Sequence, residues 1–320
     1  MSVLLLSEAD VERLLDMPTT IGVVEEAFRH LASGEAENTP RVRNKAAGVV
    51  LHSMSAAAEY LGYLGWKHYT TTKSGAKFLV GLHEQSSGDL VALIQADRLG
   101  QMRTGAVTGV ATKYLAGKDA DQVGIFGAGW QAESQLQAIA TVRPIRRAVV
   151  YSRNADTRSH FADRMSAQLG IEVVAVDQRQ QAVIDMPIVV TATTSKTPVF
   201  DGEWLASDTL VCAVGSNWLN KAEIDVTAVR RARLIVCDSI ECCQREAGDF
   251  VPAIEKGLFD WSRAIELPQI VSGGSTVPTN GITIFKSVGM AIEDVAVAAK
   301  LIQFAREQNV GSTTDLFGKD

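Results

Sequence analysis

The sequence has little cysteine, and what it has does not suggest disulfides or a metal site. Its 320 residues include four cysteines, Cys212, Cys237, Cys242 and Cys243, all within one third of the chain and two of them adjacent. A disulfide framework spreads its cysteines at regular spacings, which is not the case here. Zinc sites need paired cysteines or neighbouring histidines, and this segment has neither. We therefore expect free cysteines and no bound metal.

The sequence also lacks long apolar stretches and concentrated basic segments. No stretch approaches the ~20 apolar residues that cross a bilayer, and the first residues lack the basic start and cleavage-like site of a signal peptide. The net charge is −6, with no run of Lys and Arg interleaved with aromatic residues, which argues against a nucleic-acid surface. A hydrophobic content of 46% is normal for a globular protein. We expect a cytosolic protein whose partner is a small molecule, not a nucleic acid or a membrane.

The most informative segment of the chain joins an apolar run to a glycine-rich turn. From Val123 the run leads into Gly127-x-Gly129-x-x-Ala132. Gly127 permits a sharp turn after a strand, Gly129 permits close approach of a pyrophosphate, and Ala132 permits tight packing of the following helix. The free N–H groups and dipole at that helix start favour the phosphates. The segment predicts a dinucleotide site with Gly127 and Gly129 in contact with the cofactor.

A second strand at the right distance completes a β-α-β unit and bears on the choice of cofactor. Residues 134–140 form the expected helix and residues 148–152 the strand, which ends in Ser152-Arg153-Asn154. An acidic residue at this point pairs with a ribose 2′-OH, whereas arginine and small polar groups suit a 2′-phosphate. We expect Arg153 to stack on the adenine or to pair with the phosphate, and Ser152 and Asn154 to donate hydrogen bonds, and thus predict NADP(H), with NAD(H) as the alternative.

Two segments with different patterns divide the chain. Residues 116–299 alternate short apolar runs with helical stretches, which predicts an α/β fold with a Rossmann doubly wound parallel sheet; its expected strands are 122–127, 148–152, 171–176, 187–191, 209–214 and 233–237. Residues 1–115, joined by the C-terminal segment 300–320, predict an α+β domain with a mostly antiparallel sheet. Its expected elements are a leading strand, helices 7–15 and 21–33, strands 45–51, 62–69, 75–82 and 90–95, and helix 102–114. Residues 282–306 predict one long helix.

Ordered motifs along nearly the whole chain resemble the ornithine cyclodeaminase/mu-crystallin family. Several motifs in compatible order are far more specific than one glycine-rich turn. They are Pro40-Arg41, Gly65-Trp66-Lys67, Thr72-Lys73-Ser74-Gly75, Met102-Arg103-Thr104-Gly105, Gly127-x-Gly129-x-Gln131, Gly215-Ser216-Asn217, Lys221-Ala222-Glu223, Phe285-Lys286-Ser287-x-Gly289 and Glu293-Asp294.

The resemblance implies a homodimer whose N-terminal domain provides the subunit contact and the substrate floor. Members of the family include cyclodeaminases, alanine dehydrogenases, ketimine or pyrroline-carboxylate reductases, and a thyroid-hormone-binding crystallin. The family's carboxylate clamp corresponds to Arg41, Lys67 and Arg103 of this chain, with Arg43 as the alternative to Arg41. Such cations would fix C2 of a 2-amino, 2-keto or 2-imino acid for hydride transfer.

The resemblance also implies positions around the cofactor. Trp130 and Gln131 follow the glycine turn, and the ends of two further strands carry Thr191 and Thr193, and Val214 and Ser216. Ligands of open α/β sheets bind at the carboxyl ends of strands, so the fold supports the same positions. Lys286 has two interpretations, a substrate-binding group or a polar residue at a helix start.

Two departures from the cyclodeaminase pattern favour simple imine reduction. His52 stands where that pattern has a Glu, and Asn217 stands where it has an Asp. Closing the ring of ornithine needs a carboxylate that binds the distal ammonium and moves its proton. Asparagine cannot accept a proton, whereas reduction of an imine needs only a clamp, a hydride and one proton. His52, with an ordinary pKa near ~6.5, is a candidate donor of that proton; a structural histidine is the alternative.

The sequence thus predicts an NAD(P)H-dependent reductase of a 2-imino acid, either cyclic or formed from a 2-oxo acid and ammonia. The reverse reaction is that of an amino-acid dehydrogenase. Two alternatives stay open: an ornithine or lysine cyclodeaminase that uses other residues, and a crystallin-like protein that holds NADPH and a small ligand without turnover. Arg41, Lys67, Arg103 and Lys286 are the candidate substrate-binding residues, and Lys67, Arg103, His52 and Asn217 the candidate catalytic residues.

Overall fold

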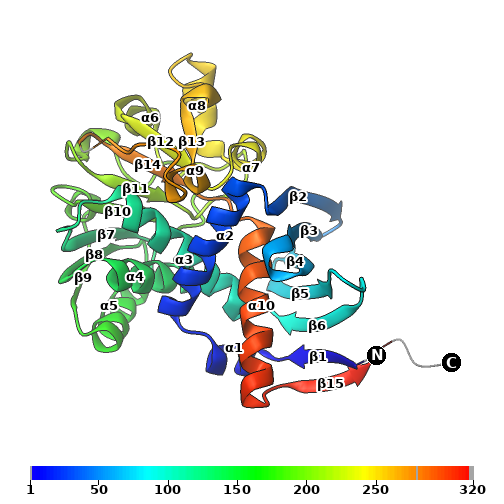
Figure 1. Cartoon of the computed structure of the whole chain (residues 1–320). Coiled ribbons are helices and arrows are strands. Elements are labelled where there is room, and N and C mark those ends of the chain that lie inside the picture. Colours follow the sequence, from blue (N-terminus) through cyan, green and yellow to red (C-terminus); the bar gives the residue numbers. More distant parts are fainter. Residues whose placement is uncertain (1, 279, 317–320) are drawn as a thin grey trace. The chain divides into compact units, whose positions relative to one another are not determined.

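The computed structural model describes residues 2–278 and 280–316, which belong to two compact units (Figure 1). The first unit combines Met1–Arg103 with Met290–Asp320, and the second is Thr104–Gly289. The boundaries expected from the sequence are 115/116 and 299/300, whereas the compact units meet at 103/104 and 289/290. Residues 317–320 of the expected C-terminal segment lie outside the described part. In the first unit, the C-terminal segment is grouped with the N-terminal one.

The first unit is built on a sheet of mainly antiparallel strands. The sheet order is β15-β1-β6-β5-β4-β3-β2, in which β1 and β6 pair in parallel and the other neighbours antiparallel. Its strands are β1 (Ser2–Leu6), β2 (Ala36–Ala46), β3 (Val49–Ala58), β4 (Tyr63–Thr72), β5 (Gly75–Glu84), β6 (Leu90–Gln95) and β15 (Ser312–Asp315). This arrangement confirms the α+β prediction for the N-terminal part.

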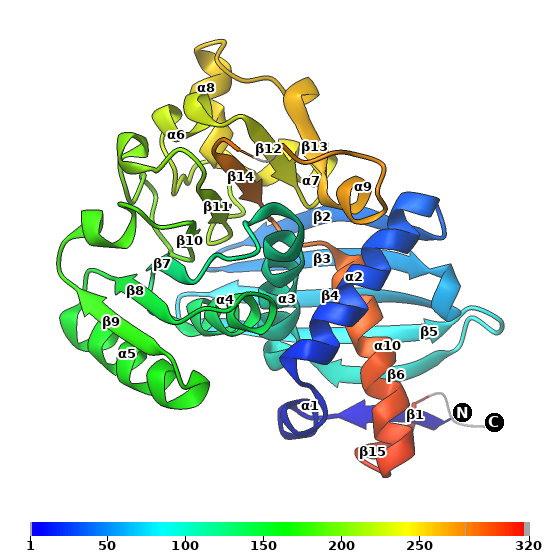
Figure 2. The same ribbon diagram turned by 60° about the vertical axis from the view of Figure 1, so that its left-hand side comes forward.

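Helices of the first unit cover one face of this sheet (Figure 2). They are α1 (Glu8–Leu14), α2 (Met17–Ser33) and α10 (Ala291–Gln308), with a short turn η1 (Glu59–Leu61). Helix α10 packs on β2 to β5 and on α2, and its residues up to Ala299 are buried all round, as is expected of a helix in the centre of a core. Helix α2 begins where Asp16 accepts a hydrogen bond from Thr19 N and ends at Gly34 with φ of 81°, because glycine adopts the left-handed conformation at little cost.

One expected strand of the first unit is wrong. Residues 45–51 form the turn of the β2–β3 hairpin instead of one strand, and Gly48 has φ of 78° within it. The segment 36–46, which forms β2, carries Glu, Asn, Pro and Lys, residues that are depleted in strands. Because β2 lies at the edge of the sheet, its polar side chains remain accessible, and the apolar alternation typical of a half-buried strand is weak.

The second unit contains an all-parallel sheet. Its order is β13-β12-β14-β11-β10-β7-β8-β9, and the strands are β7 (Gln122–Phe126), β8 (Arg147–Tyr151), β9 (Glu172–Val176), β10 (Ile188–Thr191), β11 (Leu210–Ala213), β12 (Leu234–Cys237), β13 (Ala264–Glu266) and β14 (Thr283–Lys286). The six expected strands are confirmed to within two residues. The order reverses between β7 and β10, which is where ligands of doubly wound sheets bind. The predicted Rossmann fold is correct.

The helices of the second unit connect these strands. They are α4 (Trp130–Val142), α5 (Ala155–Leu169), α6 (Val226–Arg231), α7 (Ile240–Glu246), α8 (Val251–Glu255) and α9 (Leu267–Val271), with the short turns η2 (Arg179–Ala182), η3 (Gly202–Trp204), η4 (Gly248–Phe250) and η5 (Trp261–Arg263). Helix α3 (Asp97–Leu115) begins in the first unit and continues into the second. In the described part of the chain, no helix combines the length and the apolar character needed to cross a membrane.

The single helix expected over residues 282–306 is wrong. Residues Thr283–Lys286 form the buried strand β14 between β11 and β12, and the helix α10 begins only at Ala291. A four-residue buried strand has apolar residues on both faces, so its pattern does not differ from one turn of a buried helix. The strands β13 and β15 were not expected either, because both are short and lie at sheet edges.

Candidate functional site

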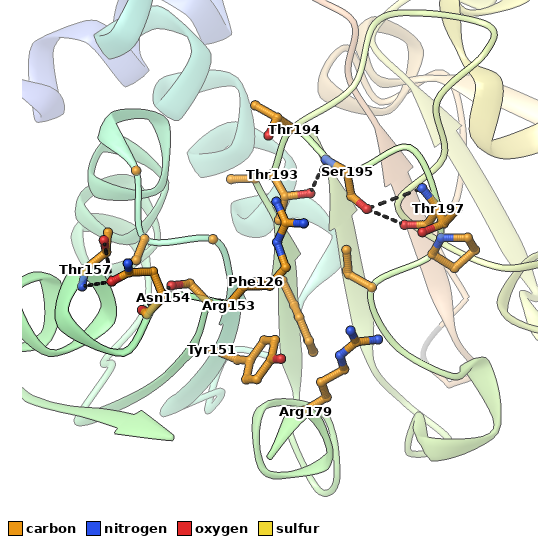
Figure 3. A pocket seen from close by; sticks show the side chains of 17 residues that line it. Phe126, Tyr151, Arg153, Asn154, Thr157, Arg179, Thr193, Thr194, Ser195 and Thr197 are labelled. Atoms are coloured by element: carbon orange, nitrogen blue, oxygen red, sulfur yellow. Dashed lines mark hydrogen bonds between the residues drawn. The ribbon is translucent and has the colours of Figure 1, made fainter. Parts of the chain in front are cut away.

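The second unit has a pocket at the carboxyl ends of its central strands (Figure 3). The pocket holds about 400 Å³ and is lined by the loops that follow β7, β8 and β10 and by one residue of the turn η2 (Arg179–Ala182) after β9. Its residues are 126–129, 151–154, 157, 179, 192–195 and 197–199. Among the predicted cofactor residues, the lining includes Gly127, Gly129, Ser152, Arg153, Asn154 and Thr193, and does not include Trp130, Gln131, Thr191, Val214 or Ser216.

The glycine turn at the mouth of this pocket fits a dinucleotide. Gly127 has φ of 107°, and a Cβ atom there would lie 2.3 Å from the carbonyl oxygen of Ala192, so only glycine is accommodated. A Cβ atom on Gly129 would meet no protein atom within 4 Å, which leaves space on that side of the backbone. Gly129 is the N-cap of α4 and supplies no side-chain cap. The first N–H groups of the helix are therefore available to a phosphate.

The three residues expected at a 2′-phosphate lie in the loop after β8 and make different contacts. Asn154 Oδ1 caps α5 by accepting from Thr157 N at 2.8 Å, and Ser152 Oγ donates to Asn154 O at 3.0 Å. Arg153 is exposed and lines the pocket. Arg179, from the turn η2 after β9, also lines the pocket, with its guanidinium 5.7 Å from the centre of the Tyr151 ring. Sequence reasoning missed Arg179 because no local motif links it to the glycine turn.

A buried carboxylate joins the loops that follow β10 and β11. Glu223, with none of its surface exposed, accepts hydrogen bonds from Thr193 N and Oγ1, each at 2.7 Å, from Thr191 Oγ1 at 3.1 Å and from Gly215 N at 2.7 Å. Burial raises the pKa of Glu223, against the opposite influence of Lys286. Glu223 thus fixes the strand ends that carry Thr191, Thr193 and, through Gly215, the segment of Val214 and Ser216.

Lys286, a predicted substrate-binding residue, is fully buried at the end of β14. Its Nζ lies 2.8 Å from Asp249 Oδ2 and donates to Ser216 O at 2.6 Å. Burial lowers its pKa, but Asp249 and Glu223 raise it further, so the net shift is upward and Lys286 stays charged. Lys286 therefore ends a strand and does not lie at a helix start, and its contacts hold the loop of Ser216. Asn217, the next residue of that loop, is half-buried.

The first unit contains a cluster of buried charges on the helix-covered side of its sheet. Lys67 of β4 and Arg103 of α3 are 2% and 7% exposed, and Glu293 and Asp294 of α10 are fully buried. Lys67 Nζ donates to Asp294 Oδ1 at 2.7 Å, and Arg103 Nε donates to the same oxygen at 3.1 Å. Arg103 Nη1 donates to Glu293 Oε2 at 2.7 Å. We call these four residues the charge cluster.

The two cations of the charge cluster differ in how readily they release a proton. Burial lowers the pKa of Lys67 to about 8, against the opposite influence of Asp294, and Arg103 and Arg41 lower it as well. Burial also acts to lower the pKa of Arg103, but Asp294 and Glu293 outweigh it, so that pKa is raised. Arg103 therefore keeps its charge, whereas the Lys67 ammonium is the more readily deprotonated of the two.

His52 of β3 lies on the same side of the sheet and is buried. Its ring stacks on Tyr69 at 4.1 Å, Arg43 Nε donates to its Nδ1 at 3.2 Å, and its Nε2 lies 3.0 Å from Thr71 Oγ1. Burial lowers the pKa of His52 to about 4, with Arg43 and Arg41 acting in the same direction. At neutral pH the imidazole is uncharged, which does not favour the expected role of proton donor.

The two arginines proposed as alternatives for the clamp lie on the same side of β2. The register of β2 against β3 shifts between Thr39 and Val42, and such a bulge re-aims side chains. Arg41 is 8% exposed, and its Nε donates to Met54 Sδ at 3.3 Å. Arg43 is opposite His52. Arg41 is therefore the more buried of the two. Its partner Met54 on β3 lies opposite Lys67 on β4.

Comparison with known proteins adds to this geometry. The model of the ornithine cyclodeaminase/mu-crystallin family matches residues 1–309. The chain belongs to this family. The resemblance stated from the motifs is thereby confirmed.

Relatives within the family include reductases and dehydrogenases of amino and imino acids as well as cyclodeaminases. A Δ1-pyrroline-2-carboxylate reductase from Bacillus cereus is 37% identical over 270 residues, which cover 81% of this chain and 82% of the relative. The structure of a Thermococcus litoralis Δ1-pyrroline-2-carboxylate reductase with NADH and L-proline has a TM-score of 0.93 and 34% identity, over 98% of this chain and all of that one. An archaeal alanine dehydrogenase dimer with bound NAD has a TM-score of 0.93 and 30% identity, over 99% of this chain and all of that one.

Proposed function

We propose that this member of the family is an NADPH-dependent reductase of 2-imino acids. The substrate is either a cyclic imine with a 2-carboxylate or the imine formed from a 2-oxo acid and ammonia. The reverse reaction oxidises the corresponding amino acid. Support comes from the pyrroline-carboxylate reductases among the relatives. It also comes from the residues that line the pocket of the second unit and from the charge cluster of the first.

The observation that carries this proposal is the charge cluster. Lys67 and Arg103 are nearly completely buried, although burial of a cation is costly unless it has partners. Arg103 uses Nε and Nη1 for Asp294 and Glu293, and its Nη2 makes no hydrogen bond among the described residues. We assign Nη2, together with Arg41 and Lys67, to the substrate carboxylate, since charge-assisted hydrogen bonds of this kind fix both position and orientation.

The residues around the charge cluster suit an imine better than a diamino acid. Glu293 and Asp294 already neutralise Arg103 and Lys67, so neither is a ready partner for the distal ammonium of ornithine. His52 is uncharged at neutral pH, and Asn217 cannot accept a proton. We therefore propose imine reduction, rather than cyclodeamination, as the reaction.

The pocket of the second unit would hold the cofactor through Gly127, Gly129 and the start of α4. A bound nicotinamide cofactor supplies the hydride for C2 of the imine. For its adenosine end we assign Arg153 and Arg179 to a 2′-phosphate, because two exposed guanidinium groups line the pocket where an enzyme specific for NAD places an acidic residue. NADH remains a weaker substitute in this proposal, since the relatives of known structure hold NADH or NAD.

A panel of substrates tests the function. NADPH oxidation is followed at 340 nm with cyclic imino acids and with 2-oxo acids plus ammonium or methylamine, and ornithine with NAD is assayed in parallel for ammonia. We expect turnover of an imine with NADPH preferred over NADH. Ammonia from ornithine without imine turnover would contradict the proposal in favour of a cyclodeaminase, and tight NADPH binding without either activity would favour a binding protein.

We also propose that the protein is a homodimer, formed through the face of the first unit's sheet opposite α10. Leu51, Leu64 and Leu79 share this face and are 40%, 43% and 38% exposed. Trp66 and His68, stacked at 4.5 Å, lie between them on β4. Apolar side chains gathered on one sheet face mark an interaction surface, and the archaeal relative of similar structure is a dimer. Light scattering should give twice the chain mass, and Leu64→Glu should give the monomer mass.

A further inference from the structure

The first unit has a pocket on the helix side of its sheet that neither the charge cluster nor the cofactor uses. It holds about 470 Å³ and is lined by α2, by the turn η1 with the start of β4, and by one face of α10 between Ala296 and Glu307. The helices α2 and α10 pack on each other (Figure 2). All of these elements belong to the first unit, and none of the four residues of the charge cluster lines the pocket. We call it the α2–α10 pocket.

Part of the lining of the α2–α10 pocket is apolar. Ala296 and Ala299 of α10 are 1% and 7% exposed, and Val23 of α2 and Leu61 of η1 also line the pocket. Alanines on one face of a helix leave space that larger side chains would fill, and close-packed proteins leave few such spaces. The pocket can therefore take an apolar side chain of a ligand.

One polar atom of the lining is buried without a partner. Tyr60 Oη makes no hydrogen bond with the residues that the structure describes. The Tyr60 ring is held by His30, whose ring stacks on it at 3.9 Å, and His30 Nδ1 in turn lies 2.7 Å from Glu35 Oε2. Burial raises the pKa of Tyr60, and the charge of Glu26 acts in the same direction, so the phenol keeps its proton. Because a buried hydroxyl without a partner is costly, a ligand that supplies an acceptor is favoured here.

The charged groups of the lining balance one another and come from both helices. Lys300 and Arg306 of α10 are the cations, and Glu26 of α2 and Glu307 of α10 are the carboxylates. Gln303 connects two of them, since Lys300 Nζ donates to its Oε1 at 2.9 Å and its Nε2 donates to Glu307 Oε1 at 2.8 Å. Within the described part of the chain, Arg306 and Glu26 make no hydrogen bond or ion pair. One cation and one carboxylate, on different helices, are thus available to a ligand.

We infer that the α2–α10 pocket is an effector site for a small α-amino acid with an apolar side chain. The effector role rests on the proposed function, whereas the binding does not. The ligand carboxylate pairs with Arg306 and accepts from Tyr60, its ammonium pairs with Glu26, and its side chain packs on the alanines of α10. A simple anion would bring its charge near Glu26, and a simple cation would bring its charge near Arg306. A zwitterion complements both groups.

The α2–α10 pocket lies on the helix that carries two members of the charge cluster. Asp294 and Lys300 are six residues apart, which is about 9 Å along a helix, and α10 is buried all round up to Ala299. A helix packed in this way transmits a displacement along its length. A ligand that ties α10 to α2 favours the position of α10 in which the charge cluster is intact. Its binding should therefore lower KM for the imine.

The first experiment measures binding at Tyr60 and does not depend on turnover. The chain has five tyrosines, so ¹⁹F NMR of the NADPH-loaded protein labelled with 3-fluorotyrosine can follow each of them, and the Tyr60 resonance is the one lost in Tyr60→Phe. L-Leucine should shift this resonance saturably, with a Kd below about 1 mM. Leucine methyl ester, which lacks the carboxylate, and 4-methylpentanoate, which lacks the ammonium, should each bind about tenfold more weakly.

Four variants test the assigned contacts through the same resonance. Arg306→Gln and Glu26→Gln should each weaken leucine binding about fivefold, since both groups are exposed. Ala299→Leu fills the pocket and should abolish the shift, and thermal unfolding checks that this variant is folded. Arg13→Gln is the matched control for Arg306→Gln, because Arg13 is an exposed arginine of α1 outside the pocket. It should leave the affinity unchanged.

The second experiment measures KM for the imine with and without saturating leucine. In the wild type and in Arg13→Gln, leucine should lower KM about fivefold. In Arg306→Gln at the same leucine concentration, and in Ala299→Leu, the decrease should be reduced or absent. Leucine that binds at the substrate site raises KM in all of these proteins alike, so the difference between them reports on the α2–α10 pocket.

Three results would overturn parts of the inference. A Tyr60 resonance that does not respond to leucine, or that responds equally to the ester and to 4-methylpentanoate, would refute an amino-acid site in favour of a crevice that holds water. A saturable shift of Tyr60 without any change in KM would refute the effector role. If no imine is turned over but leucine binds as expected, the proposed function fails while the binding site stands.

Discussion

The cofactor pocket of the second unit and the charge cluster of the first are built in opposite ways. The pocket is lined mainly by loops at the ends of neighbouring strands, and its turn is fixed where Gly127 lies against the backbone oxygen of Ala192. The charge cluster consists of side chains from β4, α3 and α10, with more than 180 residues between Arg103 and its carboxylates. A phosphate site tolerates any side chain that leaves the backbone free, whereas a buried cluster of charges depends on each of its members.

The most severe test of this contrast is to remove one cation of the charge cluster. Arg103→Met leaves Glu293 and Asp294 buried with one cation fewer, which should cost about 3–5 kcal/mol of stability. The activity on imines should fall by about 10³-fold or more, since the carboxylate loses its fixed cation. NADPH affinity, measured by fluorescence, should change little.

Arg103→Lys is the control for this prediction. It keeps a buried cation but cannot contact two carboxylates in the planar geometry of a guanidinium. Its stability should lie between those of the wild type and Arg103→Met, with activity still strongly reduced. Activity near that of the wild type in either variant would show that Arg103 is not part of the clamp.

The same contrast explains how much of the molecule the sequence could predict. The turn at Gly127 and Gly129 and the strand ending at Ser152 are local signals, and the structure places these residues in one pocket. Arg179 enters the same pocket from a turn with no motif of its own. Residue patterns within a short window report on strand ends and turns, but not on which distant turn the fold places beside them.

The partners of the buried lysines could not be predicted from the sequence for a related reason. Lys67 and Lys286 both stood out as lysines in family motifs, and both were expected to touch substrate. The structure gives Lys67 the partner Asp294 and gives Lys286 the partner Asp249, carboxylates that no spacing rule connects to them. The boundary of α10 was also obscured, because the buried strand β14 and the buried start of α10 are similarly apolar.

Replacing Lys286 tests whether the two buried lysines differ in function. Lys286→Met leaves Asp249 buried beside Glu223 without its cation, so we expect a loss of about 3–5 kcal/mol, measured by denaturant unfolding at pH 7. Folded at low temperature, the variant should keep a KM for the imine close to that of the wild type. A stable variant with a large increase in KM for the imine would restore Lys286 to the substrate site.

The glycines of the turn provide a comparison inside the cofactor pocket. Gly127→Ala puts a Cβ atom against the Ala192 carbonyl at φ of 107°, which should lower the stability of the cofactor-free protein by about 1–3 kcal/mol. Gly129→Ala meets no protein atom and should cost less than about 1 kcal/mol. It should nevertheless weaken NADPH binding about tenfold, because the new methyl group occupies the approach of the pyrophosphate. If both changes lowered the stability of the cofactor-free protein equally, the assignment of Gly127 to the turn and of Gly129 to the pyrophosphate would be wrong.

The smallest expected effects concern Arg153 and Arg179, which act on one phosphate. Each change to Ala should lower kcat/KM for NADPH by about tenfold, since a hydrogen bond to a charged group contributes about 1.5–3 kcal/mol and exposure reduces it. Values for NADH should stay within about twofold, as NADH lacks the 2′-phosphate. Arg147→Ala is the matched control, because Arg147 begins the same strand β8 and pairs on the surface with Glu172. A parallel fall with both cofactors would mean that the arginines support the adenine and not the phosphate, and the preference for NADPH would then need another origin.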